Sequence, residues 1–299
     1  ELVDAQQMIT LITCMTDPLH PELALAFRSQ AQKAVHVETC LGTAALSVFP
    51  HAIYEIVTAQ LEAKAAHAED DWSRESTQQA LQALPLARSL FDEVCSAPSV
   101  CRAPSAKARV LLELVNERRG LTLVFVEQVC CVLPMASMLA DHLKETVLHV
   151  SGALSMRKET RDKHVRAFRD GQCRVLVATA AIEEGLDVPD CDCVIRFDAF
   201  SNVKSHVQGS GRARKVGSEV FYFDNSPEEE ERRAAAMHGA AAGYLGALAE
   251  PASGKQPGLG EGHEWGPEET MWDSTENKSF RGQRCAACGA HLRITSRKY

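Results

Sequence analysis

The stretch that decides the fold is RVLVATAAIEEGLDVP, residues 174–189. Its first half is a continuous apolar run, and its second half is a polar loop that contains Gly185 and Asp187. Such runs are typical of parallel strands buried on both faces, and open α/β sheets bind their ligands where these strands end. The stretch therefore predicts a strand over 174–179 with a ligand-binding loop after it.

Three more runs of the same texture surround this strand and extend the prediction to a sheet. They are LTLVFV at 121–126, CDCVIRFD at 191–198 and SEVFYFD at 218–224. The intervening segments are long enough for crossover helices. We therefore expect an α/β domain over residues 105–225, with a parallel sheet sandwiched by helices.

The sequence predicts both ends of one helix of this domain, between residues 155 and 171. Ser155 can cap its start, Val165 and Phe168 can face the core, and Gly171 can end it.

Residues 1–104 have a different texture, rich in Ala, Gln, Leu and Glu. Apolar residues recur three and four positions apart, as at Ile53, Ile56, Val57 and Leu61. This period predicts helices and no strand, so an all-α segment is expected before the sheet.

The C-terminal part divides into three segments. Residues 226–250 begin with Ser-Pro and four glutamates, which predicts a helix. Residues 251–280 begin with a Pro- and Gly-rich stretch and are interpreted as a flexible linker. Residues 281–299 carry Cys285 and Cys288, which form half of a tetrahedral zinc site because two thiolates leave two positions empty.

Composition limits the function further. The 299 residues carry a net charge of −8, so the chain cannot hold nucleic acid through bulk positive charge, and any such binding must be local. The 11 scattered cysteines suit free thiols in a reducing compartment, which predicts a cytoplasmic location with the nucleus as the alternative. No run of 18 apolar residues occurs, so no membrane span is expected. The chain begins at Glu1, and we expect it to be a piece of a longer product.

The segment QGSGRAR, residues 208–214, is a candidate anion site. Arg212 and Arg214 flank one residue on a glycine-containing turn, so they could offer two guanidinium forks to a triphosphate. Alone, the pattern fits a solvated basic turn equally well. The loop after residue 179 adds Gly185, which permits close approach, and Asp187, which could accept from a ribose hydroxyl, although acids in a loop are also often merely solvated.

Taken in order, these segments resemble the second RecA-like domain of superfamily-two helicases. LVFVEQ at 123–128 is similar to motif IV, ATAAIEEGLDVP at 178–189 to motif V, and QGSGRAR to motif VI. The EEGLD of motif V and the leading Gln of motif VI resemble the branch of RIG-I-like receptors and Dicer. By this resemblance, residues 1–104 correspond to a helical insertion, 226–250 to a connecting helix, and 281–299 to the start of a truncated zinc-binding domain.

The resemblance implies ATP and RNA as ligands. It implies that ATP is bound by Gly185, Asp187, Gln208, Arg212 and Arg214, of which the last three act in catalysis. It implies that Ser151, Gly152 and Thr179 contact the phosphates of RNA, and the branch implies that this RNA is double-stranded. Mg would be held mainly by a first RecA-like domain, because no GxxxxGK[ST] segment or DExD/H box is present here.

The resemblance thus predicts the C-terminal motor domain of an ATP-dependent double-stranded RNA helicase or translocase of the RIG-I-like type. This chain alone is expected to be inactive, because the motor needs both RecA-like domains. Two alternatives stay open: the helicase region of a Dicer-like endoribonuclease, and a non-catalytic helicase-shaped module that binds RNA.

Overall fold

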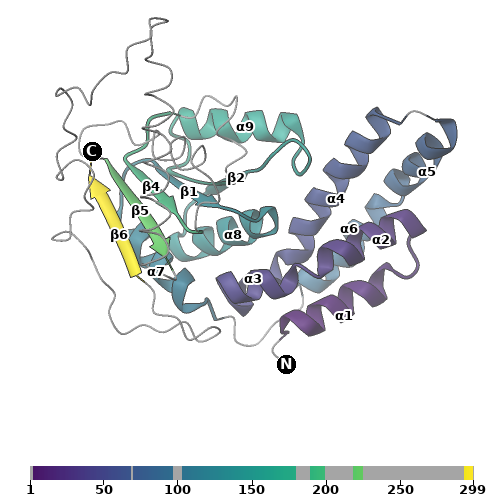
Figure 1. Ribbon diagram of the computed structural model, residues 1–299, viewed down its shortest axis with the longest axis horizontal. Helices are drawn as coiled ribbons and strands as arrows, with labels where there is room; N and C mark the ends of the chain where they lie inside the picture. Colours follow the sequence, from purple (N-terminus) through teal and green to yellow (C-terminus); the bar gives the residue numbers. More distant parts are fainter. Residues whose placement is uncertain are drawn as a thin grey trace, which may run out of the picture.

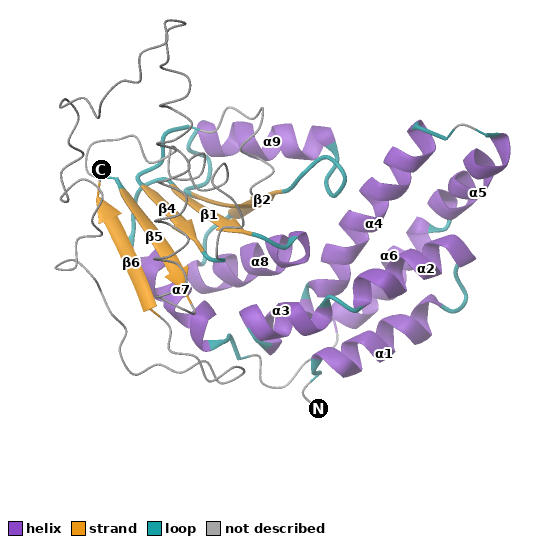
Figure 2. Cartoon of the chain, viewed as in Figure 1, coloured by secondary structure: helices purple, strands orange, loops and turns teal. Residues whose placement is uncertain are grey.

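The computed structural model describes residues 3–68, 70–96, 103–179, 189–198, 218–224 and 293–298. Helices occupy the first part of the chain, and a sheet with three further α-helices follows (Figures 1 and 2). The first part contains α1 (Ala5–Thr16), α2 (Pro21–Ala31), α3 (Ala34–Leu41), the 3-10 helix η1 (Thr43–Ser47), α4 (Phe49–Ala66), α5 (Asp71–Gln82) and α6 (Leu84–Ser96).

The second part alternates helices and strands. Its elements are α7 (Ala106–Glu117), β1 (Thr122–Val126), the 3-10 helix η2 (Val129–Cys131), α8 (Val132–Leu143), β2 (Val147–Val150), α9 (Lys158–Arg169), β3 (Val175–Thr179), β4 (Cys193–Arg196), β5 (Glu219–Asp224) and β6 (Arg293–Lys298).

The strands form one sheet in the order β2-β3-β1-β4-β5-β6. The first five are parallel to one another, and β6 pairs with β5 in the antiparallel direction. The four strands expected from apolar runs are all present, each trimmed by up to two residues at an end. β2 was not predicted, and the parallel RecA-like fold is confirmed.

Both faces of the sheet are buried, as the continuous apolar runs predicted. Side chains such as Val124, Val177 and Ile195 pack with α7 and α8 on one face, and Leu123 and Leu176 pack with α9 on the other (Figure 1). The sheet is therefore the middle layer of three.

The sequence predicted the end of helix α9 correctly but not its start. Its N-cap is Arg157, so the predicted capping by Ser155 is wrong: the Ser155 hydroxyl instead contacts the Ser151 hydroxyl at 3.0 Å. Gly171, with φ of +70°, follows the last turn as predicted and its N–H donates to Phe168 O. Phe168 is fully buried against the sheet, which fixes the helix on this face.

The helical segment shares its core with the sheet. Buried residues of α1 to α6, such as Phe27 and Ile53, belong to the same apolar cluster as Val124 and Leu139. The division between domains near residue 104 remains a prediction, because one contiguous core spans it. The predicted segments 226–250 and 251–280 lie outside the described residues.

Candidate functional site

The carboxyl ends of the parallel strands meet at one edge of the sheet (Figure 1). At this edge β2 leads into Ser151 and Gly152, β3 ends at Thr179, and β4 is followed by Asp198. The sequence predicted that ligands bind at this edge. The structure thus brings three of the predicted RNA-contacting residues to the same place.

Ser151 and Thr179 lie next to each other across two strands. Val150 pairs with Ala178 in the β2–β3 register. Ser151 follows Val150 and Thr179 follows Ala178, so Ser151 and Thr179 are neighbours as well. Neighbouring strands are about 4.8 Å apart, which is within reach of one phosphate group. The sequence alone could not predict this adjacency, because β2 was not recognised as a strand.

The Thr179 hydroxyl lacks a hydrogen-bond partner among the described residues. Its side chain is 4% exposed, and Oγ1 forms no hydrogen bond within the part of the chain that the structure describes. A buried polar group without a partner costs about 1–3 kcal/mol. Within the described residues, the hydroxyl therefore has no protein partner with which a ligand would compete.

The loop after β2 is compact and begins at this edge. Its N–H groups at Ser155 and Met156 both donate to Gly152 O, at 3.0 and 3.1 Å. The Ser151 hydroxyl accepts from the Ser155 hydroxyl, and Leu154 at the tip of the loop is 68% exposed. The turn thus holds the backbone of Ser151 and Gly152 in one conformation.

Lys107 and Asp198 form a buried ion pair that the sequence analysis did not predict. Lys107 Nζ lies 3.3 Å from Asp198 Oδ1 and 4.1 Å from the centre of the Phe197 ring. The other carboxylate oxygen of Asp198 accepts from the N–H of Glu127 at 2.9 Å. The pair therefore ties the end of β1 to the end of β4 and to the first turn of α7. No local pattern marks it, since the two side chains are 91 positions apart.

Comparison with known proteins agrees with the helicase-type fold. Residues 106–217 match the model of the helicase conserved C-terminal domain. The chain is 34% identical over 123 residues to Endoribonuclease Dicer homolog 2a of Oryza sativa subsp. japonica, and 35% identical over 133 residues to Dicer-like protein 2 of Coccidioides immitis. These matches cover 37% and 40% of this chain.

Residues 106–217 are a superfamily-two helicase C-terminal domain of the Dicer-like branch. The chain spans only 8% and 9% of the length of the two Dicer relatives. A solved structure, the E. coli DEAD-box protein SrmB bound to regulator of ribonuclease activity A, is 26% identical with a TM-score of 0.33, covering 36% of this chain and 63% of that one. The fold assignment rests on the strand order and not on that superposition.

The predicted ATP-binding residues of the helicase domain lie outside the described residues. These are Gly185, Asp187, Gln208, Arg212 and Arg214, and their roles stay predictions. The chain leaves the described part at the carboxyl ends of β3 and β4, the two strands that flank β1.

The described residues contain no candidate metal site. No cluster of three or more His, Cys, Asp or Glu side chains suited to a metal occurs within the described ranges. Cys285 and Cys288 lie outside those ranges, and the zinc site has no support.

The cysteines of the helicase domain are core residues. Burial raises the pKa of Cys193 to about 12 and that of Cys173 to about 11. Thiols with such pKa values stay protonated and are poor nucleophiles. These thiols therefore serve as small apolar core side chains. In the part of the chain that is described, no helix has the length and apolarity needed to cross a bilayer.

Proposed function

We propose that this chain supplies the C-terminal half of an ATP-dependent motor that moves on double-stranded RNA. In this proposal the backbone and hydroxyls of Ser151, Gly152 and Thr179 contact RNA phosphates. The observation that carries it is the buried Thr179 Oγ1, which has no partner among the described residues and lies beside Ser151 at the carboxyl edge. A-form RNA presents phosphates and 2′-hydroxyls, so a few donors can follow it without reading sequence.

The nucleotide belongs to the same proposal. Arg212 and Arg214, with Gln208, would contact the terminal phosphate of ATP, and Gly185 and Asp187 would lie near the nucleotide. ATP supplies the phosphoryl group whose hydrolysis drives the motor, and Mg would be held mainly by a first RecA-like domain. The chain would then be inactive by itself, because both sides of the cleft are needed.

The comparisons favour one of the two candidate parent proteins. The relatives reported above are Dicer proteins, and one of them is named an endoribonuclease. We therefore propose a Dicer-like protein ahead of a RIG-I-like receptor as the longer product. A cytoplasmic location is part of this proposal.

The substitution Thr179→Val tests the RNA contact in the full-length protein. Valine keeps the shape of threonine and removes only the hydroxyl, so the sheet should fold normally. Loss of one hydrogen bond to a charged phosphate should weaken RNA affinity about tenfold. RNA affinity is measured by fluorescence anisotropy, and ATP hydrolysis is measured with and without RNA.

Thr77→Val is the matched control. Thr77 is also fully buried, but its hydroxyl donates to Ser73 O at 2.8 Å inside α5. It should leave RNA affinity unchanged. Equal RNA affinity in Thr179→Val and in the parent would contradict the phosphate contact. A full-length parent that binds RNA but hydrolyses no ATP would instead favour the non-catalytic module.

A further inference from the structure

The loop that follows β2 is tied to the helical segment at both of its ends. We define the β2–α9 loop as residues 151–157; it contains the proposed RNA contacts Ser151 and Gly152. Two glutamates of α4, Glu55 and Glu62, bind the residues that flank and close this loop. They are seven positions apart on the helix, which is about two turns, so both lie on one face about 10 Å apart.

The first tie is at the end of β2. His149 Nε2 donates to Glu55 Oε2 at 3.0 Å, and the His149 side chain is only 11% exposed. The backbone carbonyl of His149 accepts from His164 Nδ1 of α9 at 2.7 Å. His149 stands two residues before Ser151, so the entry of the loop is fixed through both its side chain and its backbone.

The second tie is at the start of α9. Arg157 is the N-cap of this helix, and its guanidinium makes a two-pronged contact with the Glu62 carboxylate, with Nε 2.8 Å from Oε2. Planar forks of this kind fix geometry as well as supplying attraction. Arg157 closes the loop, so α4 holds its entry and its exit.

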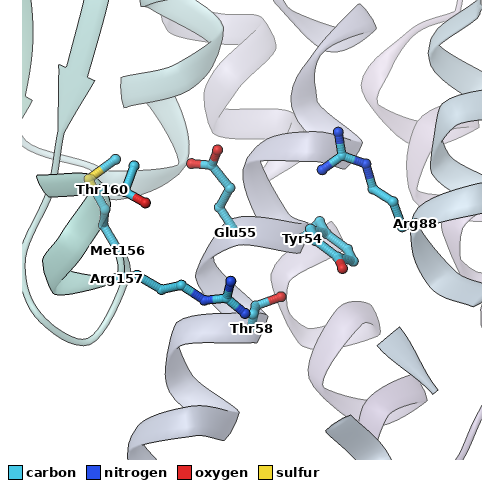
Figure 3. Close-up of a pocket in the computed structure, with 7 residues that line it drawn as sticks. All are labelled: Tyr54, Glu55, Thr58, Arg88, Met156, Arg157 and Thr160. Carbon is cyan, nitrogen blue, oxygen red and sulfur yellow. The ribbon is translucent and has the colours of Figure 1, made fainter. Parts of the chain in front are cut away.

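A pocket lies next to both ties. It has a volume of about 310 Å³ and is bordered by α4, α6 and the start of α9, with Glu55 and Arg157 among its lining residues (Figure 3). Thr58 and Tyr54 of α4 and Thr160 of α9 also line it. Apolar packing therefore does not fill this part of the contact between α4 and α9, and the His149–Glu55 hydrogen bond and the Arg157–Glu62 ion pair connect α4 with the loop.

We propose that Glu55 and Glu62 are positioning residues for RNA: from α4 they brace the β2–α9 loop so that Ser151 and Gly152 meet the phosphate. This inference rests on the proposed function. Neither glutamate needs to touch RNA, since each acts through His149 or Arg157. The position of the helical segment then determines the grip of the helicase domain on RNA.

The sign of the effect separates this brace from simple electrostatics. RNA is a polyanion, so removing a carboxylate near it should strengthen binding through charge alone. If the carboxylate positions the loop, its removal should weaken binding instead. The two explanations therefore predict opposite changes for the same substitution.

The experiment measures RNA affinity of the full-length protein with a short blunt RNA duplex at constant salt. Glu62→Gln should weaken affinity about fivefold, and the double variant Glu55→Gln with Glu62→Gln about tenfold. Asp17→Asn is the control: it removes the same charge from an ion pair with Arg28, within the helical segment and remote from the loop in sequence. It should bind RNA as the parent does.

Arg157 decides whether the brace or a direct contact operates. Under the brace, Arg157→Gln, Glu62→Gln and their combination should weaken RNA affinity by the same factor, because each breaks the same tie. The exchanged pair, Glu62→Arg with Arg157→Glu, should regain most of the affinity. It also serves if a single variant folds poorly, since it keeps an ion pair.

Unchanged or tighter RNA binding by the glutamate variants would overturn the proposal. So would a loss in Arg157→Gln alone, which would mean that Arg157 contacts RNA directly. These results are distinct from failure of the proposed function, which would appear as no RNA binding by the parent or no effect of Thr179→Val.

Discussion

Besides the apolar core that it shares with the helicase domain, the helical segment makes two polar contacts with that domain, and the two are built differently. At the α3–α7 joint the connection is made to backbone carbonyls: Ser105 N–H donates to Leu41 O at 2.9 Å, and the Ser105 hydroxyl donates to Cys40 O at 2.7 Å. At the α4–α9 seam it is made by side chains, through Glu55 with His149 and Glu62 with Arg157.

The difference lies in how freely each contact can adjust. Gly42, with φ of +90°, lies so close to the chain before α7 that a Cβ on it would be 2.3 Å from Ala103 O. Nothing there can shift without moving backbone. At the seam, long side chains border a hollow space, so small movements cost little. The joint, together with the shared apolar core, therefore fixes where the helical segment sits, and the side chains of the seam connect that segment to the β2–α9 loop.

Gly42→Ala should have the largest effect on stability. The new methyl group would both occupy an unfavourable backbone region and collide with Ala103 O and Ser105 N. We expect a loss of about 3 kcal/mol or more in the free energy of unfolding, measured by urea denaturation. Gly171→Ala is the control, because Gly171 also has positive φ, at +70°, but an added Cβ would meet nothing within 4 Å.

The control should lose only about 1 kcal/mol, from backbone strain alone. The difference between the two variants then measures the close approach at the joint. Equal losses would mean that the backbone contact contributes nothing, and the contrast between joint and seam would disappear.

The second prediction concerns pH and acts at the seam. Burial lowers the pKa of His164 below its usual value of 6.5, opposed by the hydrogen bond to His149 O and assisted by the charges of His149 and Lys163. The charge of Glu55 raises the pKa of His164 but does not reverse the net lowering. The unfolded chain therefore binds a proton more readily than the folded one. The contribution of His164 to the free energy of unfolding is fully present above pH 6.5 and is lost as the pH falls below that value.

Urea denaturation at pH 7.5 and 5.5, above the range where ordinary carboxylates titrate, measures this loss. His164→Asn keeps a donor near the His149 carbonyl and cannot be protonated, so its loss between the two pH values should be smaller than that of the parent. His67→Asn, at an exposed histidine after α4, should retain the parent's loss. Parallel pH profiles for the parent and His164→Asn would contradict the assignment.

The joint and the seam also mark the limit of what the sequence predicts. Local patterns were sufficient for the helical texture of residues 1–104, for α9 and for β1, β3, β4 and β5, because apolar period and run length reflect burial directly. β2 was missed because its four residues include His149, and a short run with a polar residue resembles a loop.

The site was predicted only residue by residue. Ser151 and Thr179 were chosen separately, but their adjacency depends on strand register, which no local pattern encodes. Ser155 was assigned to capping because a serine before a helix usually caps it, whereas here its hydroxyl closes the loop. The contacts of the seam could not be predicted from local patterns either, because Glu55 and His149 are 94 positions apart in the sequence.

The smallest expected effect on stability is that of Glu62→Gln, the substitution with the clearest predicted effect on RNA. Both side chains of the pair are partly open to water, with Glu62 38% and Arg157 54% exposed, so solvent screens their attraction. Exposed pairs of this kind contribute about 0.2–1 kcal/mol.

Urea denaturation of the parent, of each single variant and of Glu62→Gln combined with Arg157→Gln gives the coupling between the two side chains directly. A coupling of about 2 kcal/mol or more would show that the seam holds the helical segment as firmly as the joint does. A small coupling together with weakened RNA binding would separate the two functions of the contacts: the joint stabilises the fold, and the seam positions the loop.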